Sequence, residues 1–151
     1  MQSNINESFQ RQFRLRVALK EADRNETFRI RHDVYCRDLR WEAEQPNGME
    51  TDAFDAHSVH CLIQTNDERQ QPVGSLRLVL PNPRNPAGLL PAEISCAKTL
   101  DRTVFNSLQL DRRRLAEVSR FAITRDFRRS KIQRNSSDVG TEEQPPFQFI
   151  M

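Results

Sequence analysis

Four stretches of the chain alternate apolar and polar residues, and such alternation is typical of strands that bury one face. They cover residues 13–19, 58–65, 73–80 and 114–124. The polar turn NDERQQ separates the second stretch from the third, so we predict that these two strands form a hairpin. The last stretch, RLAEVSRFAIT, is predicted to be the final strand.

Between the first two strands the apolar positions change to a helical repeat. Asp23 and Glu26 lie three positions apart and predict a capping box, so we expect a helix that begins near Arg24 and fades before Trp41. One face of this helix carries residues at three- and four-residue steps. They are Thr27, Ile30, Arg31, Val34 and Tyr35. Core residues and polar site candidates therefore share one helix face.

The remaining segments are predicted to be connections. Residues 42–56 are acidic and contain a proline and an Asn-Gly pair, which predicts a long loop, and long loops are often functional. Residues 81–91 are rich in proline and predict an irregular connection. Residues 92–114 are ambiguous, and within them we expect a short helix at 102–108.

Two of the predicted strands carry charged residues. The leucines of the third strand share one face, which leaves Arg77 on the other face. In the last strand Glu117 and Arg120 have opposite parity and would project to opposite faces of a regular sheet. If both serve one cleft, a bulge must lie between them, and we predict it near Val118 or Ser119.

Length and composition indicate one domain. The chain has 151 residues, of which 36% are hydrophobic and 29% charged, enough for a modest core. No run approaches the roughly 18 consecutive apolar residues of a membrane helix. The first residues also lack the apolar stretch of a secretory signal. We therefore expect a cytoplasmic protein.

The three cysteines, Cys36, Cys61 and Cys96, are odd in number and widely separated. That distribution fits neither a disulfide framework nor a zinc site with close pairs of ligands. We expect reduced structural thiols, no metal site and no tightly bound cofactor.

Basic residues are concentrated late in the chain, although the net charge is only +2. Nine of them lie between Arg112 and Arg134, and guanidinium groups bind carboxylate and phosphate well. The stretch is either a landing site for an acidic carrier protein or a cofactor phosphate, or simply a solvated surface. Candidates for carrier binding are Arg125, Arg128, Arg129 and Lys131. Nucleic-acid binding is disfavoured because few aromatic residues are interleaved.

A spaced set of residues suggests a family. The set consists of Arg31, Tyr35, Trp41, Asp52 and Asp55, with gaps of three, five, ten and two residues, followed by Arg77 and by EVSRF at 117–121. This pattern resembles the amino-terminal part of acyl-homoserine-lactone synthases, over roughly residues 13 to 129. It is also similar to the acyltransferases associated with exosortase and PEP-CTERM systems. Tyr35 stands where the lactone synthases usually have Phe, which favours the second group.

The resemblance implies a GNAT-type N-acyltransferase with an α/β (α+β) fold, in which helices flank a mixed, mostly antiparallel sheet. Such enzymes move an acyl group from acyl carrier protein or acyl-CoA to an amine, here of an amino acid or S-adenosylmethionine. Residues 135–151 have no apolar stripe, so we expect the second half of the fold to be absent. We assign residues 1–134 to the domain and 135–151 to a polar, disordered tail.

The same resemblance suggests roles for the charged residues of the last two strands. Acylation needs a neutral nitrogen, whereas an α-amino group has a pKa of about 8. Glu117 is our candidate for positioning or deprotonating the amine, with Arg120 and Arg77 as its catalytic neighbours. The structural alternative is an ion pair between Glu117 and one of these arginines.

The substrate-binding candidates are Arg31, Tyr35, Trp41, Asp52 and Asp55. In lactone synthases the positions that match Asp52 and Asp55 belong to a charged network around S-adenosylmethionine. Alternatively these two aspartates cap turns, the arginines fasten the loop to the sheet, and Trp41 belongs to the core. Two functions thus stay open: an N-acyltransferase, or a truncated, inactive binding domain of the same fold that could form a homo-oligomer.

Overall fold

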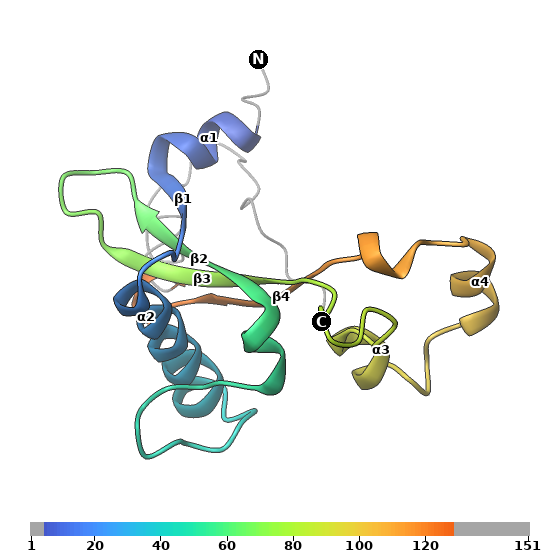
Figure 1. Cartoon of the computed structure of the whole chain (residues 1–151). Coiled ribbons are helices and arrows are strands. Elements are labelled where there is room, and N and C mark those ends of the chain that lie inside the picture. Colours follow the sequence, from blue (N-terminus) through green and yellow to red (C-terminus); the bar gives the residue numbers. More distant parts are fainter. Residues whose placement is uncertain (1–4, 129–151) are drawn as a thin grey trace, which may run out of the picture.

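A computed structural model describes residues 5–128 and shows four antiparallel strands arranged in sequence order in one sheet (Figure 1). They are β1 (Phe13–Val17), β2 (Ser58–Thr65), β3 (Pro72–Val79) and β4 (Glu117–Ile123). All four predicted strands are therefore confirmed, and β2 with β3 forms the predicted hairpin. Within the described chain every strand pair is antiparallel, in agreement with the mostly antiparallel sheet that we expected.

Helices occupy the two chain ends of this region and the connections between strands. The regular helices are α1 (Ile5–Gln12), α2 (Glu21–Arg31), α3 (Pro91–Ser95) and α4 (Arg102–Ser107). Shorter or irregular turns are the π-helical segment η1 (His32–Asp38) and the 3-10 helices η2 (Ala53–His57) and η3 (Arg112–Arg114). The pattern predicted α2 and α4, but it gave no sign of α1 or α3.

The start of α2 corrects one prediction. Lys20 is the N-cap of the helix, so α2 begins three residues before Arg24 and the expected capping box does not form. The Asp23 carboxylate instead accepts two hydrogen bonds from the guanidinium of Arg16 on β1, at 2.6 and 2.8 Å. A bidentate charged pair is stronger than a cap bond to a backbone N–H, and it ties the helix to the strand.

The core has two parts, one on each face of the sheet. On the first face α2 and η1 bury Ile30, Val34, Leu62 and Ala122. On the second face, beside α1, the core consists of Phe13, Ile63 and Val73, with Phe9, Phe121, Ile123 and Phe127 packed against them. The sheet is therefore a layer between α2 on one side and an aromatic cluster on the other.

The two faces of β3 differ as predicted. Ser75, Arg77 and Val79 are buried, whereas Leu80 is exposed and the other two leucines are only partly covered. Ser75 lies opposite Leu62 and Ala122, both in the core beneath α2. The face that carries Arg77 is thus the face that α2 covers.

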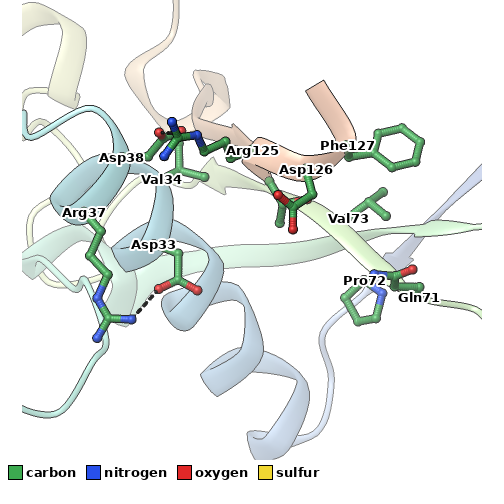
Figure 2. A pocket seen from close by; sticks show the side chains of 11 residues that line it. Asp33, Val34, Arg37, Asp38, Gln71, Pro72, Val73, Arg125, Asp126 and Phe127 are labelled. Atoms are coloured by element: carbon green, nitrogen blue, oxygen red, sulfur yellow. Dashed lines mark hydrogen bonds and ion pairs between the residues drawn. The ribbon is translucent and has the colours of Figure 1, made fainter. Parts of the chain in front are cut away.

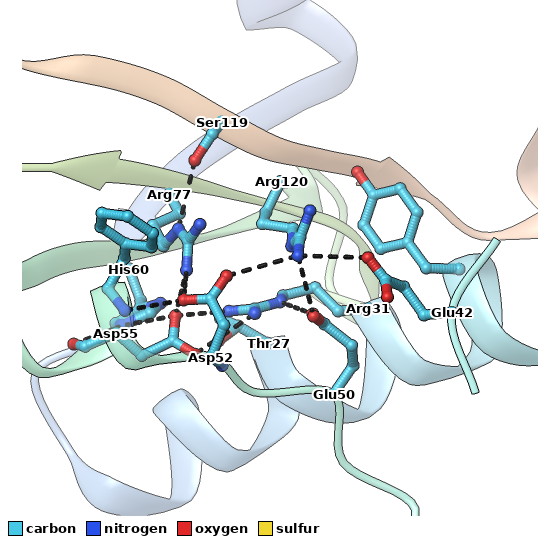
Figure 3. Close-up of polar contacts among 12 residues, drawn as sticks. Thr27, Arg31, Glu42, Glu50, Asp52, Asp55, His60, Arg77, Ser119 and Arg120 are labelled. Atoms are coloured by element: carbon cyan, nitrogen blue, oxygen red, sulfur yellow. Dashed lines mark hydrogen bonds and ion pairs between the residues drawn. The ribbon is translucent and has the colours of Figure 1, made fainter. Parts of the chain in front are cut away.

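A bulge interrupts β4. Arg77 pairs with Ser119 while Ser75 pairs with Ala122, so β4 uses three steps where β3 uses two. The extra residue falls at Arg120 or Phe121, just after the predicted position, and Arg120 has a φ of 50°. Because the additional residue reverses the alternation of side chains, Arg120 reaches the face that carries Arg77 (Figure 3).

An arm of residues 80–116 connects β3 to β4 and extends from one end of the sheet (Figure 1). It contains α3, α4 and η3. The Arg112 guanidinium donates to both carboxylate oxygens of Glu93, at 2.7 Å each, and this pair fixes the fold of the arm.

Several predictions fall on parts of the chain outside the described residues. They include Arg129 and Lys131, and the proposed tail at 135–151. Within residues 5–128 no helix is long and apolar enough to cross a membrane.

Candidate functional site

Arg31 lies at the end of α2 and only 1% of its side chain is exposed. Its Nε donates to Glu50 at 2.5 Å, and its two terminal nitrogens donate to the two oxygens of Asp55 at 2.7 and 3.2 Å. A buried guanidinium requires such partners, because an unpaired charge in the interior is strongly destabilising. Arg31 therefore joins α2 to the loop that precedes β2.

Arg77 enters the same region from β3 and is equally buried. Its Nη1 lies 2.6 Å from Asp52 and 2.7 Å from Asp55, and its Nε donates to the Ser119 hydroxyl at 3.2 Å. One guanidinium thus connects β3, β4 and η2.

Arg120, from the bulge, completes the set (Figure 3). Its Nη2 lies 3.2 Å from Glu50, 3.3 Å from Asp52 and 3.4 Å from Glu42. Unlike the other two arginines it is 28% exposed. We call this group the arginine–carboxylate cluster; it comprises Arg31, Arg77, Arg120, Glu42, Glu50, Asp52 and Asp55.

The two aspartates also cap η2. Asp52 accepts from the backbone N–H of Phe54 at 2.9 Å, and Asp55 accepts from the backbone N–H of Asp52 at 2.7 Å. The same carboxylates therefore cap a turn and pair with the arginines. A role of this network in binding S-adenosylmethionine stays a prediction.

The cluster keeps Asp55 ionised. Burial alone would raise the pKa of Asp55, but hydrogen bonds from Arg31, from the Asp52 backbone and from Arg77 lower that pKa below its ordinary value. In the same way burial opposes the charge of Arg31, while Asp55 and Glu50 raise its pKa overall. The interior of the cluster is thus a set of matched charges.

His60 borders the cluster from β2, where it pairs with Arg77 across the strands. Its Nε2 lies 3.4 Å from the Asp55 carbonyl oxygen, and its ring packs edge-on against Phe28 at 5.1 Å between centroids. Burial lowers the pKa of His60, and the charges of Arg31 and Arg77 lower it further against the opposite effect of Asp55. His60 is therefore neutral at pH 7.

Tyr35 and Trp41 form an aromatic edge beside Arg120. The Tyr35 hydroxyl donates to the carbonyl of Phe121 in the bulge at 2.8 Å, and burial raises the pKa of Tyr35. Trp41 stacks on Tyr35, with 6.1 Å between the ring centroids and an angle of 26° between the ring planes. The Arg120 guanidinium lies 5.6 Å from the centroid of the Tyr35 ring. Trp41 is 66% exposed, so it is not a core residue.

Glu117 lies apart from the arginines. Its Oε2 accepts from the backbone N–H of Ala92 in α3 at 2.8 Å. Among the described residues the Glu117 carboxylate forms no ion pair, so the structural alternative, a pair with Arg77 or Arg120, is wrong. The reason is position, because Glu117 is the first residue of β4 and faces the arm.

The carrier-binding candidates that the structure describes, Arg125 and Arg128, both contact Asp38 at the end of η1. The Arg125 Nε lies 3.5 Å from Asp38, and Arg128 donates a hydrogen bond to it. Both residues follow β4, and Arg125 lines a hollow of about 650 Å³ (Figure 2). The hollow is lined by residues 33, 34, 37, 38, 71–73 and 124–127.

Sequence reasoning missed Glu50 and Glu42. Glu50 is 5% exposed and contacts both Arg31 and Arg120. Its backbone N–H donates to the Phe28 carbonyl at 3.1 Å, which holds this part of the loop against α2. The acidic loop 42–56 has no periodicity that would mark one of its glutamates as buried. The only sequence signal for Glu50 was its position two residues before Asp52.

Three cysteines are free in the structure: Cys36 and Cys61 are buried and Cys96 is exposed. Burial raises the pKa of Cys36 and of Cys61, which suits inert thiols better than nucleophiles. Across residues 5–128 no group of three or more His, Cys, Asp or Glu side chains is arranged to hold a metal ion.

A comparison with protein families now adds to this geometry. Residues 30–135 match the model of the acetyltransferase (GNAT) domain. No curated protein and no solved structure gave a significant match. The matched range starts one residue before Arg31 and extends beyond β4, so it contains the whole arginine–carboxylate cluster and the bulge. The antiparallel sheet with flanking helices agrees with that fold, and the chain belongs to the GNAT acetyltransferase family.

Proposed function

We propose that this chain is an N-acyltransferase that moves a fatty acyl group from acyl carrier protein or acyl-CoA to the amine of a small acceptor, an amino acid or S-adenosylmethionine. Membership of the GNAT family supports acyl transfer in general. One observation supports the site. The bulge in β4 directs Arg120, the exposed arginine of the cluster, toward the same edge as the stacked Tyr35 and Trp41.

The charge of the cluster favours a cationic acceptor. Four carboxylates (Glu42, Glu50, Asp52 and Asp55) face three guanidinium groups (Arg31, Arg77 and Arg120), which leaves one negative charge in excess. An exposed Trp ring next to this excess adds attraction for an ammonium or sulfonium group. The carboxylate of the acceptor would bind Arg120, the arginine with solvent access.

Glu117 remains the candidate base. In the described structure its Oε2 is engaged with the Ala92 N–H, and Oε1 forms no hydrogen bond there, so Oε1 is available to an amine. A carboxylate in this place accepts the proton that an ammonium group must lose before it attacks a thioester. The arm then belongs to the site, because it orients that carboxylate.

A second function, a binding domain without catalysis, is favoured by the density of ion pairs. Arg31 and Arg77 use their donors on Glu50, Asp52, Asp55 and Ser119. Both arginines thus fasten the 42–56 loop to the sheet whether or not chemistry occurs there.

Thiol release from a long-chain acyl carrier protein, with and without S-adenosylmethionine or free amino acids, tests the proposal. We expect release that depends on the amine and that falls strongly in Glu117→Gln, a variant that retains an acceptor oxygen for the Ala92 N–H. Release of methylthioadenosine would identify lactone formation from S-adenosylmethionine. If a folded sample leaves the thioester intact with every amine, the binding domain is the correct function.

A further inference from the structure

The arm of residues 80–116 exposes an unusual number of apolar side chains. They are Leu89, Ile94, Val104, Leu108 and Leu110, and between 44% and 58% of each is exposed. Single apolar residues on a surface are ordinary, but several on one projecting element indicate an interaction surface.

The acidic residues of the arm are occupied within it. Glu93 binds Arg112 and accepts from the Leu90 N–H at 2.9 Å. Asp101 accepts from the backbone of α4 at 2.9 and 3.2 Å, and Asp111 accepts from the Arg113 N–H at 3.0 Å. Their negative charges are therefore used in capping and internal pairing.

The remaining basic residues of the arm face solvent. Arg84, Lys98, Arg102 and Arg114 are exposed, and none of them forms an ion pair with any residue in the range 5–128. The arm thus exposes both apolar and unpaired basic side chains. Its complement is an acidic surface that carries some apolar side chains.

The position of the arm relates it to the candidate site. The arm leads directly into β4, and the hydrogen bond between Glu117 and the Ala92 N–H joins α3 to the start of that strand. Arg120 and the bulge follow three residues later. A protein bound to the arm would be held beside the strand at which the acyl group is transferred.

We propose that the arm is the docking surface for the donor, an acidic carrier protein that delivers the acyl thioester. This inference rests on the proposed acyl-transfer function. The exposed apolar residues supply apolar contact area, and the four basic residues supply charge complementary to the carrier. A free CoA thioester has phosphates that basic residues attract, but it has no protein surface to match the apolar residues of the arm.

Arm variants test this proposal with two donors of the same chain length, acyl carrier protein and acyl-CoA. The variants are the double substitution Arg102→Glu with Arg114→Glu, and separately Leu108→Ser. Arg69→Glu, in the exposed turn between β2 and β3, is the matched control. We expect kcat/KM with the carrier-bound donor to fall about tenfold or more in the charge variant, because steering by opposite charges changes association by that order. In Leu108→Ser we expect the kcat/KM for the carrier-bound donor to fall while the kcat/KM for acyl-CoA is unchanged. Arg69→Glu should leave the kcat/KM of both donors unchanged.

A titration of the chain with holo acyl carrier protein separates docking from catalysis. We expect weaker binding by both arm variants and weaker binding of the unaltered chain at high salt. If neither thioester is turned over, the proposed function fails while this titration still decides the docking proposal. Equal carrier binding by the unaltered chain and the arm variants would overturn it. So would a dimer that the arm variants dissociate in sedimentation, because the arm would then be covered by a second copy.

Discussion

The Nη1 atoms of Arg31 and Arg77 each lie 2.7 Å from the same oxygen, Oδ1 of Asp55. Two positive charges from different elements, α2 and β3, therefore meet at one carboxylate from η2. Asp55 is the carboxylate that both guanidinium groups share, whereas Glu50 binds Arg31 and Asp52 binds Arg77. Loss of its charge would therefore affect both buried arginines, and a buried charge that loses a partner is costly. This arrangement makes Asp55 the most sensitive residue of the cluster.

We expect Asp55→Asn to destabilise the fold by about 3–5 kcal/mol, the cost of removing one partner from a buried ion pair. The substitution retains size but leaves the two guanidinium groups short of a negative charge. Urea unfolding of both proteins measures the difference. Asp33→Asn is the control, because the Asp33 and Arg37 side chains that form this ion pair are each 59% exposed. This substitution should change the free energy of unfolding by less than about 1 kcal/mol. Equal effects of the two substitutions would contradict the role of Asp55 as the shared partner of two buried arginines.

Stability should fall in acid in two steps. His60 has a lowered pKa in the folded state, so below about 6.5 the unfolded chain binds a proton that the folded chain does not. Asp55 also has a lowered pKa. The contribution of Asp55 to the free energy of unfolding is complete above about pH 3.9, the pKa of an ordinary Asp. It is lost as the pH falls through the lower pKa that Asp55 has in the folded protein.

Unfolding free energy measured between about pH 2 and about pH 8 covers both steps. In His60→Gln, which has no group that titrates near neutrality, we expect the decline below about pH 6.5 to become shallower. The second step, below about pH 4, should persist in this variant. An identical pH profile for both proteins would show that His60 is not the group responsible.

The sequence predicted the sheet well because alternation depends only on burial of one face. It also predicted the bulge, since Glu117 and Arg120 could serve one face only if the strand alternation were broken. The geometry confirmed that Arg120 crosses to the buried face. The bulge lies slightly later than predicted because the register is set by pairing with β3, which the sequence of β4 alone does not specify.

Long-range pairing explains the errors. Asp23 has the spacing of a cap, but Arg16 on a neighbouring strand binds it more strongly. Glu50 is hidden in an acidic loop, and only the fold brings Arg31 and Arg120 to it. Glu117 was grouped with Arg77 and Arg120 by the family resemblance, whereas the start of β4 faces the arm. Local patterns carry no information about such partners.

Tyr35→Phe should loosen the bulge. The hydroxyl donates to the Phe121 carbonyl at 2.8 Å, and its removal leaves that carbonyl without this partner, a loss of about 1–2 kcal/mol. We expect faster hydrogen exchange of backbone amides in β4, with α1 unaffected. Trp41 should remain stacked, because the Phe ring has the same shape. Unchanged exchange in β4 would show that the bulge does not depend on this hydrogen bond.

Trp41→Ala should separate binding from stability. The ring is 66% exposed and stacks on Tyr35, so its loss should change the free energy of unfolding by less than about 1 kcal/mol, as at other surface positions. Under the proposed function we expect the KM for a cationic acceptor to rise about tenfold, equivalent to about 1.4 kcal/mol of lost binding. Trp41→Phe should recover part of the lost affinity, because a smaller aromatic face still attracts a cation.

Leu19→Ala is the matched control. Leu19 is 78% exposed and follows β1, the strand at the opposite edge of the sheet from β4. If Trp41→Ala leaves the acceptor KM unchanged while Glu117→Gln abolishes turnover, the aromatic edge does not contact the acceptor, and the acceptor binds on the arm side of Arg120.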